Sequence, residues 1–212
     1  MKALKIPEAT VVRLSLYSRH LRQLINDGTL TVSSGEIAAG VGVSSAQVRK
    51  DLAYFGEFGT RGVGYNVQEL HGHIVRILGL NREWNVVIVG VGKLGSALAV
   101  YKGFASRGFN IVGLMDVSEQ RIGLSLGKLV IEPLTILEQR IREKSVKIGI
   151  ITVPGSAAQE VADMMTAAGV SSILNFSPRV LKVPKRVILR NVDLSVNMEV
   201  LSFYLSRFES RQ

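Results

Sequence analysis

Cysteine is absent from this chain of 212 residues, and only three histidines are present. The absence of cysteine excludes disulfides, thiol redox chemistry and cysteine-ligated metals. His71 and His73 are two positions apart, and that spacing points them to different faces of a helix. We therefore expect them to be surface or core residues rather than metal ligands, and we expect no metal site.

Long apolar runs are also missing. No run approaches the roughly 18 residues of a membrane-spanning helix, and residues 1–8 lack the apolar core of a secretory signal. Acidic residues are few, with 17 Asp and Glu against 26 Lys and Arg, so the formal net charge is +9. This balance favours a polyanionic partner, nucleic acid before others. We expect a cytoplasmic protein with no membrane partner.

The most regular pattern in the chain is a glycine-rich turn between an apolar run and a helical run. Residues 86–95 read Val-Val-Ile-Val-Gly-Val-Gly-Lys-Leu-Gly, and a helical pattern follows over 96–105. In the dinucleotide fingerprint, Gly90 would allow the turn, Gly92 would let backbone N–H groups approach a pyrophosphate, and Gly95 would let helix and strand pack closely. The β-branched run predicts a buried strand, so the whole pattern predicts a nucleotide-type βαβ unit.

Asp116 ends a second apolar run about 20 positions past the last glycine of this turn, where the fingerprint has its acidic residue. Its carboxylate is expected to accept hydrogen bonds from the adenosine ribose hydroxyls and to repel a 2′-phosphate. Val117 and Ser118 offer no cation to receive that phosphate. The sequence therefore favours NAD(H) over NADP(H), although Arg121 leaves the choice open. A loop-capping role for Asp116 is the alternative.

About 80 residues precede this nucleotide motif, enough for a small independent domain. Apolar residues three and four apart over 7–27 predict a first helix. Capping-box spacings that begin at Ser33 and Ser44 predict two short helices starting near residues 34 and 45. A glycine-containing turn at 40–43 separates them, which is the helix-turn-helix pattern.

The second of these short helices has the composition of a DNA-recognition helix. Its buried stripe is expected to contain Val48, Leu52 and Phe55, which leaves small and basic side chains on the opposite face. Near the start of such a helix, a Gln, Arg or Lys side chain can read base edges in the major groove or contact backbone phosphates. The residues assigned to DNA contact here are Ser45, Ala46, Gln47, Arg49 and Lys50. A solvated helix face is the alternative interpretation.

Residues 54–67 alternate aromatic or apolar residues with glycines and predict a β-hairpin with Arg61 at its tip. After a recognition helix, such a hairpin would be the wing of a winged helix-turn-helix, with Arg61 entering the minor groove. A glycine-rich structural loop is the alternative. An amphipathic run over 67–78 closes the domain, and 79–85 is interpreted as a linker, so we place the DNA-binding domain at residues 1–80.

The C-terminal half alternates strand-like and helical runs. The strand-like runs lie at 129–131, 147–153, 172–175 and 187–189, and the helical runs at 134–142 and 156–168. This alternation predicts a mainly parallel, doubly wound, Rossmann-like sheet over residues 85–195, so the fold class is α/β. Residues 153–155 and 175–178 fall at carboxyl ends of strands, the edge where such sheets bind ligands. Ordinary loop formation is the alternative for these residues.

The last segment predicts an apolar helix. Met198, Leu201, Leu205 and Phe208 follow a three-four-three spacing. Such a helix packs either on its own sheet or on a second subunit, and its aromatic residues favour the subunit. We therefore separate residues 196–212 as a C-terminal dimerisation helix.

The nucleotide domain leaves no room for the substrate domain of a dehydrogenase, and no histidine follows Gly90. Because histidine is the usual proton shuttle, the site is interpreted as a sensor rather than a catalyst. A DNA-binding half joined to an NAD-binding half suggests transcription governed by the cofactor.

Over nearly its whole length the chain resembles the Rex family of bacterial redox-sensing transcriptional repressors. The resemblance lies in residues 6–10 with Arg13 and Leu14, in 47–52, 54–56, 62–67 and 90–95 with Tyr101, and in 152–154, 158–159 and 175–178. It implies a homodimer that binds a palindromic operator in double-stranded DNA, senses the ratio of NADH to NAD+, and releases the DNA when NADH binds. It also implies that the C-terminal helix is exchanged between subunits.

With this resemblance, the expected site residues form two further sets. The cofactor-contacting set is Gly90, Val91, Gly92, Lys93, Leu94, Gly95, Tyr101, Asp116, Val117, Thr152, Val153, Pro154, Asn175 and Phe176. The switch set is Asp193, which would need a partner if buried, with Arg19 and Tyr101 as its candidate partners. Leu194 stands where some family members carry Phe near the nicotinamide, and Lys93 occupies a variable position of the glycine loop.

An alternative from another class is a CoA- or NAD-binding enzyme subunit, because the same fold resembles the CoA-binding domain of acyl-CoA ligases. Asp116 argues against CoA, since a ribose 3′-phosphate would meet a carboxylate.

Overall fold

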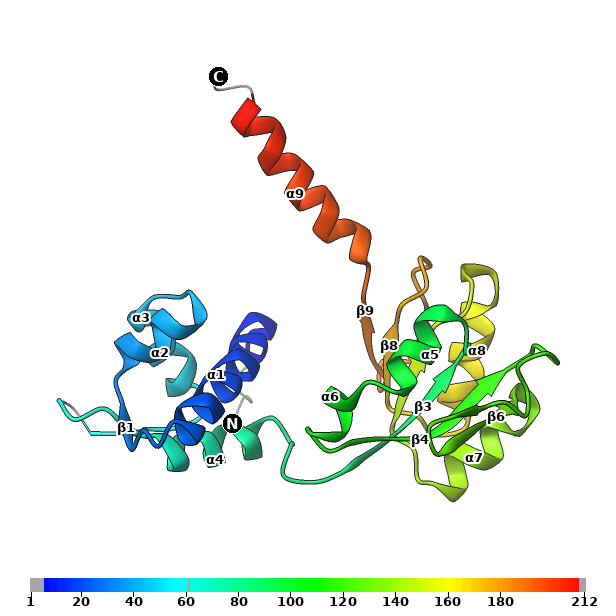
Figure 1. Ribbon diagram of the computed structural model, residues 1–212, viewed down its shortest axis with the longest axis horizontal. Coiled ribbons are helices and arrows are strands. Elements are labelled where there is room, and N and C mark those ends of the chain that lie inside the picture. The colour runs from blue at the N-terminus through cyan, green and yellow to red at the C-terminus, as the bar shows by residue number, and fades with distance from the viewer. Residues whose placement is uncertain (1–5, 61, 210–212) are drawn as a thin grey trace. The chain divides into compact units, whose positions relative to one another are not determined.

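The computed structural model describes residues 6–60 and 62–209, and it divides into two compact units, residues 1–82 and 83–212 (Figure 1). The elements of the first unit are α1 (Glu8–Asn26), β1 (Thr31–Val32), α2 (Ser34–Val41), α3 (Ser45–Ala53), β2 (Tyr65–Asn66) and α4 (Val67–Ile77). Its core is built from the apolar stripes of the four helices, with Leu14, Leu21, Ile37 and Ile74 fully buried. The predicted helix-turn-helix is present as α2 and α3.

Serine caps begin both short helices of this unit, as the spacing predicts, but only one forms a complete capping box. Ser33 and Glu36 bond each other's backbone N–H groups at the start of α2. At α3 the Ser44 side chain accepts from the Gln47 backbone, whereas the Gln47 side chain turns to Asp51 instead.

The wing differs from the prediction of a hairpin over residues 54–67. Within the described part of that segment, one isolated bridge joins Thr60 to Gly64. β2 pairs instead with β1 in antiparallel fashion, Thr31 with Asn66 and Val32 with Tyr65. Glycines with positive φ angles explain the short hairpin, because they interrupt the extended backbone; they are Gly56, Gly59, Gly62 and Gly64. The prediction also missed β1, which has only two residues.

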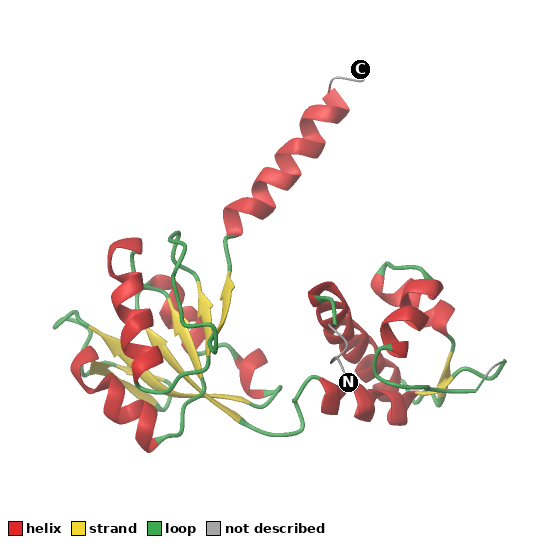
Figure 2. Ribbon diagram, turned by 180° about the vertical axis from the view of Figure 1, so that it is seen from behind, coloured by secondary structure: helices red, strands yellow, loops and turns green. Residues whose placement is uncertain are grey.

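The second unit is a seven-stranded sheet with helices on both faces (Figures 1 and 2). Its elements are β3 (Trp84–Val89), α5 (Lys93–Ala99), α6 (Lys102–Ala105), β4 (Phe109–Asp116), β5 (Ser125–Leu126), β6 (Leu129–Pro133), η1 (Leu134–Ile136), α7 (Leu137–Glu143), β7 (Ile148–Ile151), α8 (Gly155–Ala167), β8 (Ser172–Asn175), β9 (Ile188–Asn191) and α9 (Leu194–Glu209). The strand order is β5-β6-β4-β3-β7-β8-β9, and all pairs except β5 with β6 are parallel. The six parallel strands therefore have the Rossmann order 3-2-1-4-5-6.

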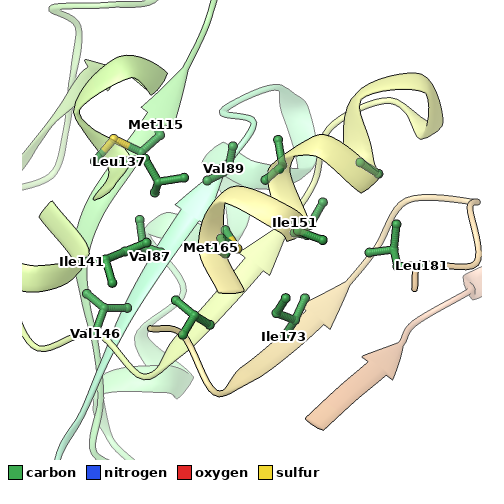
Figure 3. Packing of buried hydrophobic residues seen from close by; sticks show 14 of the residues in the cluster. Val87, Val89, Met115, Leu137, Ile141, Val146, Ile151, Met165, Ile173 and Leu181 are labelled. Atoms are coloured by element: carbon green, nitrogen blue, oxygen red, sulfur yellow. The ribbon is translucent and has the colours of Figure 1, made fainter. Parts of the chain in front are cut away.

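The alternation of side chains along β3 assembles the core on the two faces of this sheet. Val87 and Val89 pack with α7 and α8 on one face, the cluster shown in Figure 3. Val86 and Ile88 face the other way, toward residues of α5 and α6. Because both faces are covered at β3, the run from Val86 to Val89 is apolar without interruption, as is common in parallel sheets.

The helical run predicted over residues 96–105 is wrong as a single helix. α5 ends at Ala99, and Tyr101 has an extended backbone with φ −71° and ψ 105° before α6 begins. In this position the Tyr101 ring occupies the space beside Gly103, where a Cβ would lie 2.4 Å from ring atoms, and it meets Phe104 edge-on. The linker is also shorter than the predicted range 79–85, because Trp84 and Asn85 belong to β3.

The C-terminal helix α9 is present, and every residue from 193 to 208 is exposed. Nine apolar or aromatic side chains of α9 are exposed by half or more: Leu194, Val196, Met198, Val200, Leu201, Phe203, Tyr204, Leu205 and Phe208. Within residues 6–60 and 62–209, no helix combines the length and the apolar character needed to cross a membrane.

Candidate cofactor site and DNA-binding surface

The glycine loop that follows β3 is held in a tight turn by contacts that leave no room for side chains at two of its glycines. Gly90 has φ +95°, and a Cβ there would lie 2.7 Å from Val153. A Cβ at Gly95 would lie 2.0 Å from the Gly90 carbonyl oxygen. At Gly92, by contrast, the space around a Cβ is open to 4 Å. The loop is therefore closed on its protein side and open at Gly92, where a ligand can approach the backbone.

Asp116 closes the same turn from the end of β4. One carboxylate oxygen, Oδ2, accepts from the Val91 N–H at 2.7 Å, and Oδ1 accepts from the N–H groups of Val117 and Ser118 at 2.8 and 2.9 Å. The Arg121 guanidinium lies 3.3 Å from Oδ2. Burial acts to raise the pKa of Asp116, but these hydrogen bonds and the Arg121 charge outweigh it and hold the pKa below its ordinary value.

A cavity of about 540 Å³ opens beside this turn. It lies at the carboxyl ends of β3, β4 and β7, and the order of the parallel strands reverses between β3 and β7, the place where open α/β sheets bind ligands. Seven of the expected cofactor residues line it: Gly90, Gly92, Asp116, Val117, Thr152, Val153 and Pro154. A second cavity, of about 460 Å³, includes Val91, Gly92, Lys93 and Arg121. The volumes are those of ordinary small-molecule sites.

Sequence reasoning missed four apolar residues that line the main cavity, Val89, Leu134, Ala157 and Val161. Val89 ends β3, Leu134 begins η1, and Ala157 and Val161 lie on α8. Nothing in their local sequence marks them as more than core residues. Thr152 also has a structural part, because its Oγ1 donates to the Gly90 carbonyl oxygen at 2.6 Å. It thereby ties the end of β7 to the glycine loop.

Several expected cofactor residues do not line either of these two cavities. Asn175 is fully buried, and its amide donates to the Arg179 carbonyl and to Asn191 Oδ1, both at 2.9 Å. Phe176 packs against the core on the α5 side of the sheet. Leu94 and Tyr101 are exposed, while Gly95 is buried at the helix start. Cofactor contact by these residues stays a prediction.

On the first unit, α3 presents the surface expected of a recognition helix. Val48 and Leu52 are buried, whereas Ala46, Lys50 and Ala53 are exposed, as the helical periodicity predicts. Ser45 and Gln47 are half-buried, and Arg49 is exposed with its Nη1 donating to Ser34 Oγ at 2.9 Å. Arg61, expected at the wing tip, lies outside the described residues.

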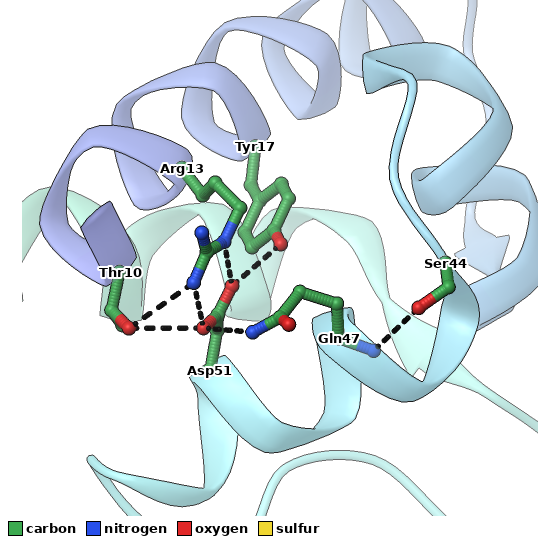
Figure 4. A network of polar contacts seen from close by, with 6 residues as sticks. All are labelled: Thr10, Arg13, Tyr17, Ser44, Gln47 and Asp51. Atoms are coloured by element: carbon green, nitrogen blue, oxygen red, sulfur yellow. Dashed lines mark hydrogen bonds and ion pairs between the residues drawn. The ribbon is translucent and has the colours of Figure 1, made fainter. Parts of the chain in front are cut away.

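Sequence reasoning missed a buried polar network that joins α3 to α1 (Figure 4). The Asp51 side chain is fully buried and pairs with Arg13, which donates from Nε at 2.5 Å and from Nη2 at 2.7 Å. Tyr17, Thr10 and Gln47 also donate to it. Burial acts to raise the pKa of Asp51, but these donors lower it to about 2. The signal in the sequence is an aspartate on the same helix face as Val48 and Leu52, with Arg13 and Tyr17 one turn apart on the first helix.

The residues expected to act as a switch have separate surroundings. Asp193 is exposed, and its Oδ1 accepts from the backbone N–H and the hydroxyl of Ser195 at 2.9 and 2.7 Å, which lowers its pKa. Arg19 is exposed on α1. Tyr101 is also exposed, with its ring against Phe104. A pairing among the three stays a prediction.

Comparison with known proteins identifies relatives of the whole chain. A redox-sensing transcriptional repressor Rex from Syntrophomonas wolfei is 68% identical over 206 residues, which cover 97% of this chain and 98% of that protein. A Rex repressor from Streptomyces coelicolor is 50% identical over 202 residues, or 95% of this chain and 78% of that protein. The chain belongs to the Rex family of redox-sensing transcriptional repressors.

Two family models match separate parts of this Rex chain. The N-terminus of putative DNA-binding proteins matches residues 5–53, and the CoA binding domain matches residues 81–179. A crystal structure of the Rex-family repressor RSP with β-NAD+ and operator DNA has a TM-score of 0.92 at 38% identity, covering 97% of this chain and 94% of that one. The crystal structure of RSP with β-NADH has a TM-score of 0.87 at 37% identity, and the match covers 96% of each chain.

Because full-length Rex relatives are transcriptional repressors, this chain is a repressor and not an enzyme. The match to the CoA binding domain thus describes a nucleotide-binding fold that Rex shares with that family. The alternative of an acyl-CoA ligase subunit is not retained.

Proposed function

We propose that this Rex-family chain acts in the cytoplasm, binds a palindromic operator as a homodimer, and is released from the DNA by NADH. The observation that carries the proposal is the combination, in one chain, of a recognition helix with exposed basic residues and a glycine-loop cavity that ends at a carboxylate. The net charge of +9 suits a polyanionic partner.

The cofactor site fits NAD(H) by its own geometry. The open space at Gly92 admits a pyrophosphate to the loop backbone, and Asp116 faces the same cavity with its charged carboxylate. When bound, NAD(H) supplies the redox signal through its nicotinamide ring. The residues of this chain bind and orient it: the glycine loop receives the phosphates, and Asp116 accepts from the ribose hydroxyls while repelling a 2′-phosphate. Preference for NAD(H) over NADP(H) follows.

Ligand binding can release DNA only if NADH binds the DNA-free state more tightly than the DNA-bound state. By reciprocity, operator DNA must then weaken NADH binding by the same factor by which NADH weakens DNA binding. The helix α9, which leaves its apolar side chains exposed, is the element we assign to the subunit interface. Asp193, Arg19 and Tyr101 remain our candidates for the contacts that differ between the two states.

The test is a fluorescence anisotropy titration of a palindromic operator duplex with the full chain, alone and with NAD+, NADH or CoA. We expect NADH to weaken operator binding, NAD+ to preserve it and CoA to have no effect. A matched titration of NADH with and without operator should give the same coupling factor. Operator affinity that is unaffected by NADH would contradict the proposal.

A second test concerns the DNA surface, where we propose that Ser45, Ala46, Gln47, Arg49, Lys50 and Arg61 contact DNA. Lys50 is exposed on α3, and Lys50→Ala removes one phosphate contact from each half of the dimer. The slope of log affinity against log salt should therefore flatten by about 2. Lys128→Ala, which removes the same charge from the β5–β6 turn, is the control. An unchanged slope for Lys50→Ala would mean that the face of α3 is assigned wrongly.

A further inference from the structure

The Gln47 side chain is the one proposed DNA contact that the fold holds by a buried charge. Gln47 is the third residue of α3, and its Nε2 donates to Asp51 Oδ1 at 2.9 Å (Figure 4). Asp51 has no exposed surface and belongs to the same helix. Gln47 itself is half-buried, so its amide reaches from the buried carboxylate to the surface.

Chemistry fixes which way this amide faces. An ionised carboxylate accepts hydrogen bonds and donates none, and the amide group has two N–H donors on one side and a carbonyl acceptor on the other. With its pKa at about 2, Asp51 is ionised at neutral pH. The nitrogen of Gln47 must therefore face Asp51. Within the described residues its Oε1 has no hydrogen-bond partner, and one N–H remains for a further acceptor.

The hydrogen bond from Gln47 adds little to the stabilisation of the Asp51 carboxylate, because side chains of α1 already donate to both of its oxygens. Arg13 donates to both oxygens of Asp51, Tyr17 donates to Oδ2 at 2.8 Å, and Thr10 donates to Oδ1 at 3.0 Å. Gln47 supplies a fifth hydrogen bond from the exposed side. The main effect of this hydrogen bond is therefore on Gln47, because it prevents the amide from rotating by 180° and exchanging its nitrogen and oxygen.

We propose that Asp51 is a positioning residue that locks the Gln47 amide in the orientation that reads adenine and rejects guanine in the major groove. This inference rests on the proposed binding of operator DNA by α3. Adenine presents an amino donor and the N7 acceptor, which match the free Oε1 and the second N–H of Gln47. Guanine presents two acceptors, and one of them would face Oε1. A Gln47 amide turned over would donate toward those acceptors instead, and Asp51 prevents that turn.

The test begins by selecting duplexes from a random pool with the wild-type chain, which gives the preferred half-site. Each base pair of the half-site is then replaced in turn, and dissociation constants are measured by fluorescence anisotropy. With Gln47→Ala we expect the preference for adenine at one position to fall about 10- to 100-fold, with the ratios at other positions unchanged. Lys50→Ala is the matched control, because loss of a phosphate contact weakens all sequences alike.

Asp51→Asn tests the lock itself. The asparagine amide can accept from or donate to Gln47, so the Gln47 amide is free to turn over. The affinity for guanine relative to adenine should then rise at that same position. Circular dichroism shows whether the variant keeps its helices, and NADH titration shows whether the second unit is intact. If Asp51→Asn weakens all sequences by one factor and leaves every ratio unchanged, Asp51 is only structural and the inference is wrong.

Gln47→Glu keeps the test decisive if Asp51→Asn does not fold. The glutamate side chain of this variant would have no N–H to donate to Asp51 Oδ1 or to adenine N7, and the two carboxylates would repel each other. The preference for adenine should therefore be lost. Retained adenine preference in Gln47→Glu, or unchanged ratios in Gln47→Ala, overturns the inference while leaving the proposed function intact. A wild-type chain that selects no sequence contradicts the proposed function instead.

Discussion

Two buried aspartates, one in each unit, are kept ionised by different kinds of donor. Side chains surround Asp51, with Arg13 as the charged partner. Backbone N–H groups surround Asp116, and Arg121 approaches from the exposed side. Backbone donors fix a loop, whereas side-chain donors fix one helix against another. Asp116 therefore shapes the glycine turn as well as facing the cavity, and Asp51 sets α3 on α1.

Replacing Asp116 by alanine removes both the expected ribose acceptor and the contact with the Val91 N–H. Loss of charge-assisted hydrogen bonds should weaken NADH binding by about 1.5 to 3 kcal/mol. Loss of the negative charge should reduce the ratio of NADH affinity to NADPH affinity. Fluorescence titration with both nucleotides measures this. Glu119→Ala removes an exposed carboxylate from the same loop and should leave both affinities unchanged. Equal NADH affinity in Asp116→Ala would remove this residue from the site.

The Asp51 network makes stability dependent on acid. Because the pKa of Asp51 falls from 3.8 to about 2 on folding, ionisation favours the folded state by about 2 kcal/mol. This contribution is complete above pH 4 to 5 and is lost as the pH falls through 3.8 toward 2. Urea unfolding followed by circular dichroism between pH 2 and 6 should show it, and Asp51→Asn should lack that part of the pH dependence. A variant with the wild-type pH dependence would contradict this account.

At the scale of elements, sequence periodicity predicted those helices and strands that depend on local apolar spacing. The helices α1, α4 and α8 and the strands β3 and β4 follow from apolar spacing, and the glycine turn follows from its fingerprint. The two-residue strand β1 was missed because its partner, β2, lies more than 30 residues away. The break between α5 and α6 was missed because it depends on the ring of Tyr101 packing beside Gly103.

The candidate site divides in the same way. Asp116, Gly90 and Gly92 stand at fixed offsets in the sequence, and those offsets indicated that they would lie together; they line one cavity. The Asp51 network and the lining residue Val161 depend on which helix packs against which strand or helix, and such contacts carry no local signal.

The glycine loop offers a matched pair of substitutions. A Cβ at Gly95 would lie 2.0 Å from the Gly90 carbonyl, whereas at Gly92 the space is open and φ is −75°. Gly95→Ala should therefore destabilise the second unit, seen as a lower midpoint of thermal unfolding. Gly92→Ala should keep the wild-type midpoint but weaken NADH binding at least tenfold, because its methyl group occupies the space left for the ligand. Wild-type NADH affinity in Gly92→Ala would place the ligand elsewhere.

For the molecule as a whole, two units with separate hydrophobic cores are joined in one chain, and α9 adds its side chains to neither core. Its nine exposed apolar or aromatic side chains are more than an isolated surface helix normally presents to water. The helix therefore depends on a partner for burial, and we assign that partner to a second copy of the chain.

Deleting α9 from Leu194 onward tests this assignment. The shortened chain should be monomeric by analytical ultracentrifugation, bind the operator poorly and no longer respond to NADH. Leu205→Glu should weaken dimerisation in the full-length chain more than Ser206→Glu, its neighbour on the same helix. A shortened chain that stays dimeric and still releases DNA with NADH would reduce α9 to ordinary packing.

The hydrogen bonds that hold the glycine loop have a consequence for the timing of the response. Asp116 accepts from the Val91 N–H, and Thr152 donates to the Gly90 carbonyl, so the protein's own hydrogen bonds fix the shape of the loop. A preformed site pays little ordering entropy on binding, and loop closure does not slow the encounter. NADH and NAD+ should then associate at similar rates and differ in how long they stay bound. The residence time of NADH would set how quickly the repressor registers a fall in the reduced cofactor.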